Sequence, residues 1–190
     1  MIVGLVLITL LSACQKEPIS RLMLTAEGMG GGGKMTVNGL ASYWQTGDAV
    51  NINGEASSIT VSGSQAYVDG EFSADNYCVV FPASIYQSRS GSVVTINMPA
   101  SYQYKTSGGR QVLDAPMAYY GTAENGRVMM KHLTGALNFE ITGPAEISID
   151  CITISTYLPS NRKMSGEMQF DLSDIENIGS TAQGSVLSND

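Results

Sequence analysis

The sequence has few charged residues and a single histidine. Lysine and arginine number 10 against 17 aspartates and glutamates, and this net charge of −7 excludes a basic surface for nucleic acid. His132 alone cannot form a histidine-based metal cluster. No apolar run reaches about 18 residues, so no membrane-spanning helix is expected. Charged residues make up only 14% of the chain, but 43% apolar residues exclude a disordered protein.

The first apolar segment has the size of a secretory signal core. Ile2–Ala13 carries no charge and runs into Leu11-Ser12-Ala13-Cys14, which resembles a bacterial lipobox. The lipobox predicts cleavage before Cys14 and lipidation of its thiol, and several acyl chains make a firm anchor. We therefore expect a signal peptide at 1–13, a lipidated tether at 14–21 and an outer-membrane, cell-surface location. The alternative is a buried apolar strand with an incidental cysteine.

From Leu22 onward, short apolar or alternating runs between Gly, Asn, Asp and Ser turns predict β-strands. The expected strands are Leu22–Ala26, Asp48–Asn53, Ser58–Ser62, Asn76–Ala83, Ser92–Met98, Met117–Gly121, Arg127–His132, Ala136–Thr142, Glu146–Thr156 and Glu167–Leu172. Asp171–Asn177 allows one helical turn at most. This pattern predicts an all-β fold, an antiparallel β-sandwich over residues 22–179. Residues 180–190 form a polar tail or a linker to a second domain.

Some of the expected strands contribute residues that we assign to the core. These core residues are Trp44, Val50, Ile52, Leu137, Phe139, Ile141, Ile147, Ile149, Ile152 and Ile154. Cys78 and Cys151 lie in apolar runs, where a disulfide and two buried free thiols are both possible in an exported protein. Gly28–Lys34 nearly matches a P-loop, but Met35 stands where Ser or Thr would hold Mg²⁺. We therefore expect no nucleotide, metal or other cofactor.

Five segments share their order and spacing with a known family of surface proteins. They are Trp44-x-x-Gly47-Asp48-x-Val50-x-Ile52, Tyr77-x-Val79-x-Phe81-Pro82-Ala83, Ala115-Pro116-Met117-Ala118, Val128-x-Met130-x-His132-Leu133 running into Ala136-Leu137-x-Phe139-x-Ile141, and Ile147-x-Ile149-x-x-Ile152-x-Ile154-Ser155 with Ser165-Gly166. Together with the lipobox, the set resembles the N-terminal domain of the fimbrillins, the type V pilins and fimbrillin-like lipoproteins of Bacteroides-type bacteria. The resemblance implies a transthyretin-like sandwich.

The resemblance also implies an assembly role without catalysis. In that family a trypsin-like protease cuts after the first strand, and a donor strand from another subunit fills the groove that is left, so subunits join into an adhesive pilus or fimbrium. The displaced strand here would be Leu22-Met23-Leu24-Thr25-Ala26. The candidate processing residues are Lys34, in the glycine-rich loop where the family has arginine, and Arg21, which is expected to precede the strand. The expected partners are other fimbrillin-type subunits, which supply the donor strand, and the outer membrane through the lipid anchor. A host or bacterial glycan or protein is a further candidate partner in adhesion.

Two other classes of function remain as alternatives. Tyr102, Tyr104, Tyr119 and Tyr120 lie in or near a long polar loop and could stack on sugar rings, which would suit a non-polymerising, glycan-binding surface lipoprotein. Stacking on sugars would require these tyrosines to lie together, exposed, on one face of the protein. A secreted hydrolase would instead need two carboxylates that face each other across a cleft.

Overall fold

The computed structural model describes most of the chain between residues 18 and 177. The described residues are 18–26, 35–37, 40–42, 44–63, 65–101, 105–107, 110–112, 115–134, 142–144, 146, 148, 150–153 and 165–177. Within these ranges, no helix has the length and apolar character needed to cross a bilayer. The expected strand at 136–142 lies outside the described residues, apart from Thr142.

The described residues form strands and short 3₁₀ turns, which confirms the all-β prediction. The strands are β1 (Ile19–Ala26), β2 (Met35–Val37), β3 (Leu40–Ser42), β4 (Ala49–Ile52), β5 (Glu55–Ser58), β6 (Thr60–Ser62), β7 (Gln65–Phe72), β8 (Tyr77–Phe81), β9 (Tyr86–Ser90), β10 (Val93–Met98), β11 (Lys105–Ser107), β12 (Arg110–Val112), β13 (Met117–Gly121), β14 (Arg127–His132) and β15 (Gly166–Asp171). The 3₁₀ turns are η1 (Ala83–Ile85), η2 (Glu124–Gly126) and η3 (Leu172–Asn177). At most one helical turn was predicted over 171–177, whereas η3 consists of two short 3₁₀ pieces that meet at a kink at Asp174.

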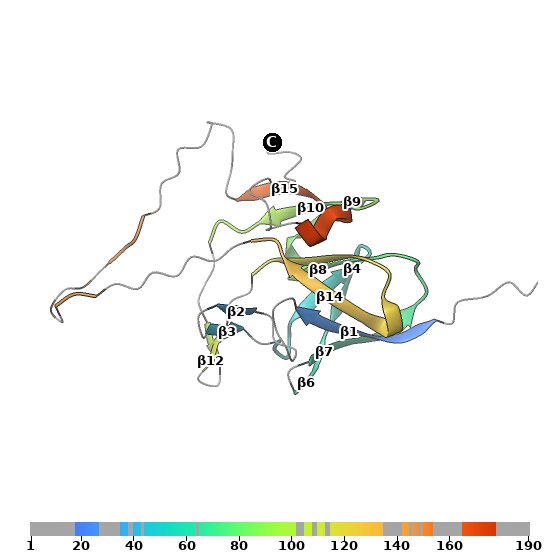
Figure 1. Cartoon of the computed structure of the whole chain (residues 1–190), viewed down its shortest axis with the longest axis horizontal. Coiled ribbons are helices and arrows are strands. Elements are labelled where there is room, and N and C mark those ends of the chain that lie inside the picture. Colours follow the sequence, from blue (N-terminus) through green and yellow to red (C-terminus); the bar gives the residue numbers. More distant parts are fainter. Residues whose placement is uncertain are drawn as a thin grey trace, which may run out of the picture.

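The main sheet has eight strands in the order β5-β4-β8-β13-β14-β1-β7-β6 and curves nearly into a barrel (Figure 1). Its two outer strands, β5 and β6, are separated in the chain by Ile59 alone. The Ile59 amide donates to the Asp48 carbonyl at 3.1 Å, and its side chain is buried. The chain therefore continues directly from one edge of the curved sheet to the other.

One strand pair corrects the prediction of a purely antiparallel arrangement. β1 runs parallel to β14, with Met23 opposite Arg127 and Ala26 opposite Met130. All other strand pairs among the described residues are antiparallel. β1 and β14 are far apart in sequence, so no hairpin constrains their directions, and the main sheet is mixed.

The centre of the main sheet is buried on both faces. Along β8, Tyr77, Val79 and Phe81 face one core, inside the curve of the sheet, whereas Cys78 and Val80 face a second core. β8 is an interior strand between β4 and β13, which explains its continuous apolar sequence. Trp44 packs edge-on against Phe81 at 5.2 Å between ring centroids, so its predicted place in the core is confirmed.

A smaller sheet of three strands, β15-β10-β9, covers part of the outer face of the main sheet (Figure 1). Val94 and Ile96 of β10 and Phe170 of β15 pack in the second core with Val80. β9 contributes mostly exposed polar residues, which is why no strand could be predicted there. Two layers are therefore present over one part of the main sheet.

The strand expected at Glu146–Thr156 is wrong where the structure describes it. Asp150, Cys151, Ile152 and Thr153 are not in a strand, and Ile152 is 49% exposed rather than in the core. Of the other predicted core residues, Val50 and Ile52 are buried as expected. The remaining predicted core residues lie outside the described part of the chain; they are Leu137, Phe139, Ile141, Ile147, Ile149 and Ile154.

Cys78 and Cys151 are separate free thiols, the first buried and the second exposed. Burial raises the pKa of the Cys78 thiol, and the nearby Arg89 offsets only part of this effect. The thiolate is the reactive form, so Cys78 is doubly protected, by burial and by its raised pKa.

We therefore expect the two thiols to react at very different rates. In a Cys14→Ser chain, a thiol reagent such as Ellman's reagent will label Cys151 at once and Cys78 only as fast as the protein unfolds. Cys151→Ser will remove the fast phase and leave the slow one. Two fast phases, or no reactive thiol before reduction, would contradict this structure.

Candidate functional site

The strand nearest the N-terminus of the described chain lies in the interior of the main sheet. β1 sits between β14 and β7 (Figure 1). On one side it pairs with β14 from Met23 to Ala26, and on the other it pairs antiparallel with β7 from Ile19 to Leu24. The structure describes no direct pairing of β14 with β7. The continuity of the sheet at this point therefore depends on β1.

One face of β1 is fully embedded in the first core. Leu22, Leu24 and Ala26 alternate along the strand and are all buried. They pack in a cluster that includes Ala66 and Val68 of β7 and Val128 and Met130 of β14. Burial of a leucine side chain contributes roughly 1.5–3 kcal/mol. If β1 left, a groove lined by apolar side chains and flanked by two unpaired strand edges would remain.

The alternation predicted for Leu22–Ala26 is therefore confirmed, but β1 begins at Ile19 rather than at Leu22. Arg21 consequently lies within the strand, opposite Asp69 of β7, and not before it as predicted. Its backbone belongs to the sheet ladder. Proteases cut exposed backbone that is free of such pairing, so Arg21 is a poor processing site in the folded chain.

The turn η2 holds the first half of β1 by close backbone contact. Gly126 adopts a φ of +73° and is buried, and a Cβ atom at this position would lie 2.6 Å from the Arg21 carbonyl oxygen. The same Cβ would lie 3.1 Å from the side chain of Ile19. Only glycine fits both the backbone conformation and the space, so Gly126 lets η2 approach β1.

The outer face of β1 carries a charged contact with β7. Arg21 Nε donates to Asp69 Oδ1 at 2.5 Å, and its guanidinium carbon lies 5.2 Å from the centroid of the Tyr67 ring. The hydrogen bond and the negative charge of Asp69 raise the pKa of the Arg21 guanidinium. The Tyr67 hydroxyl donates to Gln65 Oε1 on the same strand. Arg21 therefore stays fully charged against an acidic and aromatic surface of β7.

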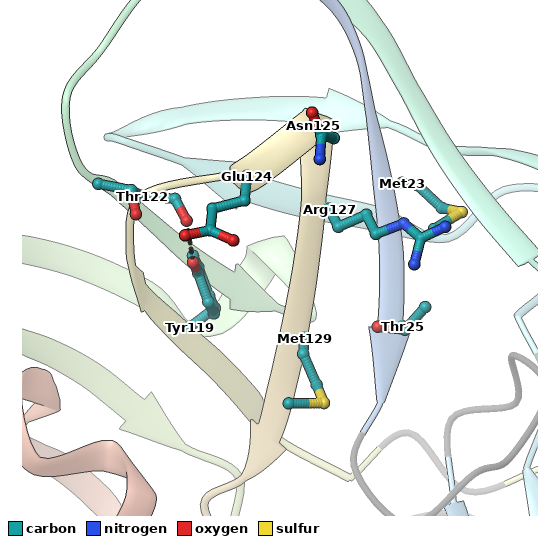
Figure 2. Close-up of a pocket in the computed structure, with 8 residues that line it drawn as sticks. All are labelled: Met23, Thr25, Tyr119, Thr122, Glu124, Asn125, Arg127 and Met129. Atoms are coloured by element: carbon teal, nitrogen blue, oxygen red, sulfur yellow. Dashed lines mark hydrogen bonds between the residues drawn. The ribbon is translucent and has the colours of Figure 1, made fainter.

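An open depression of about 800 Å³ lies beside this contact, over the outer face of β14 (Figure 2). Its lining residues are Met23, Thr25, Tyr119, Thr122, Glu124, Asn125, Arg127 and Met129. In Figure 2, Tyr119 and Glu124 approach each other on one side of β14, and Thr25 of β1 lies on the other side. Met129 is 50% exposed, and it is one of the few large apolar side chains on the described surface. β1 thus forms one wall of the depression.

Tyr119 is fixed in place at this depression. Its hydroxyl donates to the Thr122 carbonyl at 2.6 Å. Burial, and to a lesser extent the Glu124 carboxylate, raise the pKa of the Tyr119 phenol. The lining contains no histidine, cysteine or serine. Its polar groups are the hydroxyls of threonine and tyrosine, the Glu124 carboxylate, the Asn125 amide and the Arg127 guanidinium.

Two of the four tyrosines expected to form a sugar-stacking surface, Tyr119 and Tyr120, do not share a face of the sheet. Tyr119 packs against the first core and Tyr120 against the second, so the two lie on opposite faces of β13, both half-buried. Tyr102 and Tyr104 lie outside the described residues. The prediction that these tyrosines form one stacking surface is therefore wrong for Tyr119 and Tyr120.

Two other predicted sites, the lipidation residue Cys14 and the processing residue Lys34, also lie outside the described residues. Within the described ranges, histidine, cysteine, aspartate and glutamate side chains form no group of three or more that could hold a metal ion. The sequence did not single out Gly126, Tyr67 and Asp69. Only the Asn125-Gly126 pair, a common turn signal between two apolar runs, could have indicated the turn over β1.

The inward face of β1 should carry much more stability than the outer face beside it. We expect Leu24→Ala to lower the free energy of unfolding by about 2–5 kcal/mol, because it leaves a cavity in the first core. Met129→Ala, on the exposed outer face, should change it by less than about 0.5 kcal/mol. Urea unfolding monitored by Trp44 fluorescence measures both. Equal losses would contradict the burial of Leu24 in the first core and the exposure of Met129 on the outer face of β14.

Substitution of Gly126 should destabilise the protein in two ways, through the clash with β1 and through the strain of a positive φ, and the two contributions can be measured separately. Gly91 has a similar φ of +60°, but a Cβ added there would meet nothing within 4 Å, so it is a matched control. We expect Gly91→Ala to cost about 1 kcal/mol and Gly126→Ala about 3 kcal/mol, the difference arising from the clash with Arg21. Similar losses in the two variants, measured by urea unfolding, would show that η2 does not hold β1.

The chain matches no family model, no curated protein and no solved structure.

Proposed function

We propose that this chain is a non-catalytic surface lipoprotein of the fimbrillin type, in which β1 is a replaceable strand. A donor strand from another subunit takes the place of β1 and joins the two subunits by strand addition. The protein then acts as a subunit or accessory subunit of an adhesive pilus. In this proposal the two-layer arrangement of strands is transthyretin-like, as the resemblance implies.

The observation that carries the proposal is the position of β1 between β14 and β7. An N-terminal strand can be removed by one cut in the chain after Ala26. Its buried residues, Leu22, Leu24 and Ala26, alternate with outward-facing ones, so any strand with the same alternation can satisfy both the ladders and the core. If an edge strand were removed instead, only one neighbouring strand would lose its pairing partner.

The second core supports the same proposal. It is built from β8, β10, β13 and β15 with neighbouring turns, and β1 contributes no residue to it. Loss of β1 would uncover the first core while the contacts of the three-stranded sheet remain. A subunit awaiting its donor would thus retain a folded part.

The processing site that we propose is Lys34, in the glycine-rich segment that follows Ala26. We do not propose Arg21 for this role, because cleavage there would cut a paired strand and leave Leu22–Ala26 attached to the chain. Lysine in place of arginine requires a protease that accepts lysine. The lipid on Cys14 would hold the precursor at the outer membrane until this cut.

The N-terminus of the mature protein on its native cells tests the proposal directly. We expect mass spectrometry to find chains that begin at Met35 in the assembled, surface-exposed fraction. Lys34→Gln should block the cut and give a monomeric, membrane-held protein. As a matched control, Lys16→Gln removes a lysine between Cys14 and β1 and should leave processing unchanged.

The opposite result is equally clear. If surface chains begin only at acylated Cys14, then β1 stays in the sheet and the protein is not assembled by strand replacement.

A further inference from the structure

We propose that the β1 position selects its incoming strand by a basic residue, which Asp69 and Tyr67 of β7 recognise. This inference rests on the proposed function and specifies its partner. The incoming strand, from a second subunit, must carry arginine or lysine where Arg21 now lies. Asp69 and Tyr67 are both on β7, so they stay in the chain when β1 leaves.

The contact is built from two different interactions with one cation. Asp69 accepts a hydrogen bond from Arg21 Nε, and Tyr67 presents its ring face to the guanidinium at 5.2 Å. The side chains of Arg21 and Asp69 are 56% and 54% exposed, so an arriving strand can reach Asp69 from solvent. Glu71, farther along the same strand, is exposed and adds a second negative charge to β7. An acidic residue in the Arg21 position would be repelled.

The alternation of the apolar residues of β1 does not by itself define the register. Side chains alternate with a period of two, so a slip of two residues keeps every apolar residue on the inward face. Leu22, Leu24 and Ala26 are spaced at this period and lie opposite or near the equally apolar Val68 and Ala66. A two-residue slip would, however, move a basic residue away from Asp69. The charged contact therefore favours the same register as the packing of the two large residues and the small one in the first core.

The incoming strand thus needs a defined pattern. A basic residue comes first, followed by a large apolar residue, any residue, a second large apolar residue, any residue and a small one, as in Arg21-Leu22-x-Leu24-x-Ala26. The backbone ladders supply most of the affinity for any extended strand, and the charge discriminates among strands. Gly126 must also approach the backbone at the basic position, and the ladder with β7 shifts its register between Ile19 and Arg21, so the incoming strand has to be extended from the basic residue onward.

Strand exchange in the uncleaved chain, from position 14 to Asp190 with Cys14→Ser, tests this inference. A specific protease sequence is inserted between Gly30 and Gly31, the chain is cut, and the cut protein is mixed in mild urea with fluorescent peptides of residues 19–26. The peptides carry arginine, alanine or glutamate at position 21. Anisotropy then gives the affinity of each peptide.

We expect the arginine peptide to bind about threefold to tenfold more tightly than the alanine peptide, as fits an exposed ion pair with a cation–π contact. The glutamate peptide should bind most weakly. Asp69→Ala should remove most of this preference, and Asp69→Lys should reverse it in favour of glutamate. Glu71→Ala, which removes a neighbouring charge, should keep the preference for arginine.

The outcomes separate the two proposals. Equal affinity of all three peptides for the unmodified chain would overturn the selection by charge and leave strand replacement intact. Failure of every peptide to bind, including the one with the native sequence, would contradict strand replacement itself and this inference with it. A preference for arginine that persists in Asp69→Lys would also overturn the role of Asp69.

Discussion

The pairing of β1 on both of its edges is the constraint on which the rest of the main sheet depends. β14 and β7 are joined only through β1 in the described structure, and the strands beyond them, β13 on one side and β6 on the other, are aligned through them. A ladder that is complete on both sides satisfies the backbone donors and acceptors that an edge strand would expose. The same arrangement makes one short segment responsible for the closure of the first core.

The two cores divide the molecule into parts with different dependence on β1. The first core takes Leu22, Leu24 and Ala26 from β1, whereas the second takes none of its residues. β8 and β13 belong to both cores, because their successive side chains point to opposite faces. Removal of β1 would therefore expose only the side chains of β8 and β13 that point into the first core. This division explains physically how a strand could leave without unfolding the whole chain.

The sequence predicted the local elements much better than their arrangement. The alternation at Leu22–Ala26 and the continuous apolar run in β8 correctly predicted strands. Burial on one face requires an apolar residue at every second position, and burial on both faces requires apolar residues throughout. The parallel pairing of β1 with β14 could not be found in this way, because the partners lie about a hundred residues apart, as do Thr25 and Val128. The apolar residue Ile152 misled the prediction, because alternation alone does not show that another layer covers it. Gly126 was missed because its role arises only where two distant segments meet.

The three parts of the β1 contact perform different tasks, and none can replace another. Backbone hydrogen bonds hold any extended strand, and they do not distinguish sequences. The alternating apolar residues decide which face turns inward, and the smaller Ala26 at their end disfavours a slip of two residues. Arg21 against Asp69 and Tyr67 is also asymmetric along the strand, so it favours the same register. An exposed ion pair adds little stability, so it acts chiefly on the choice among incoming strands whose apolar residues fit the first core equally well.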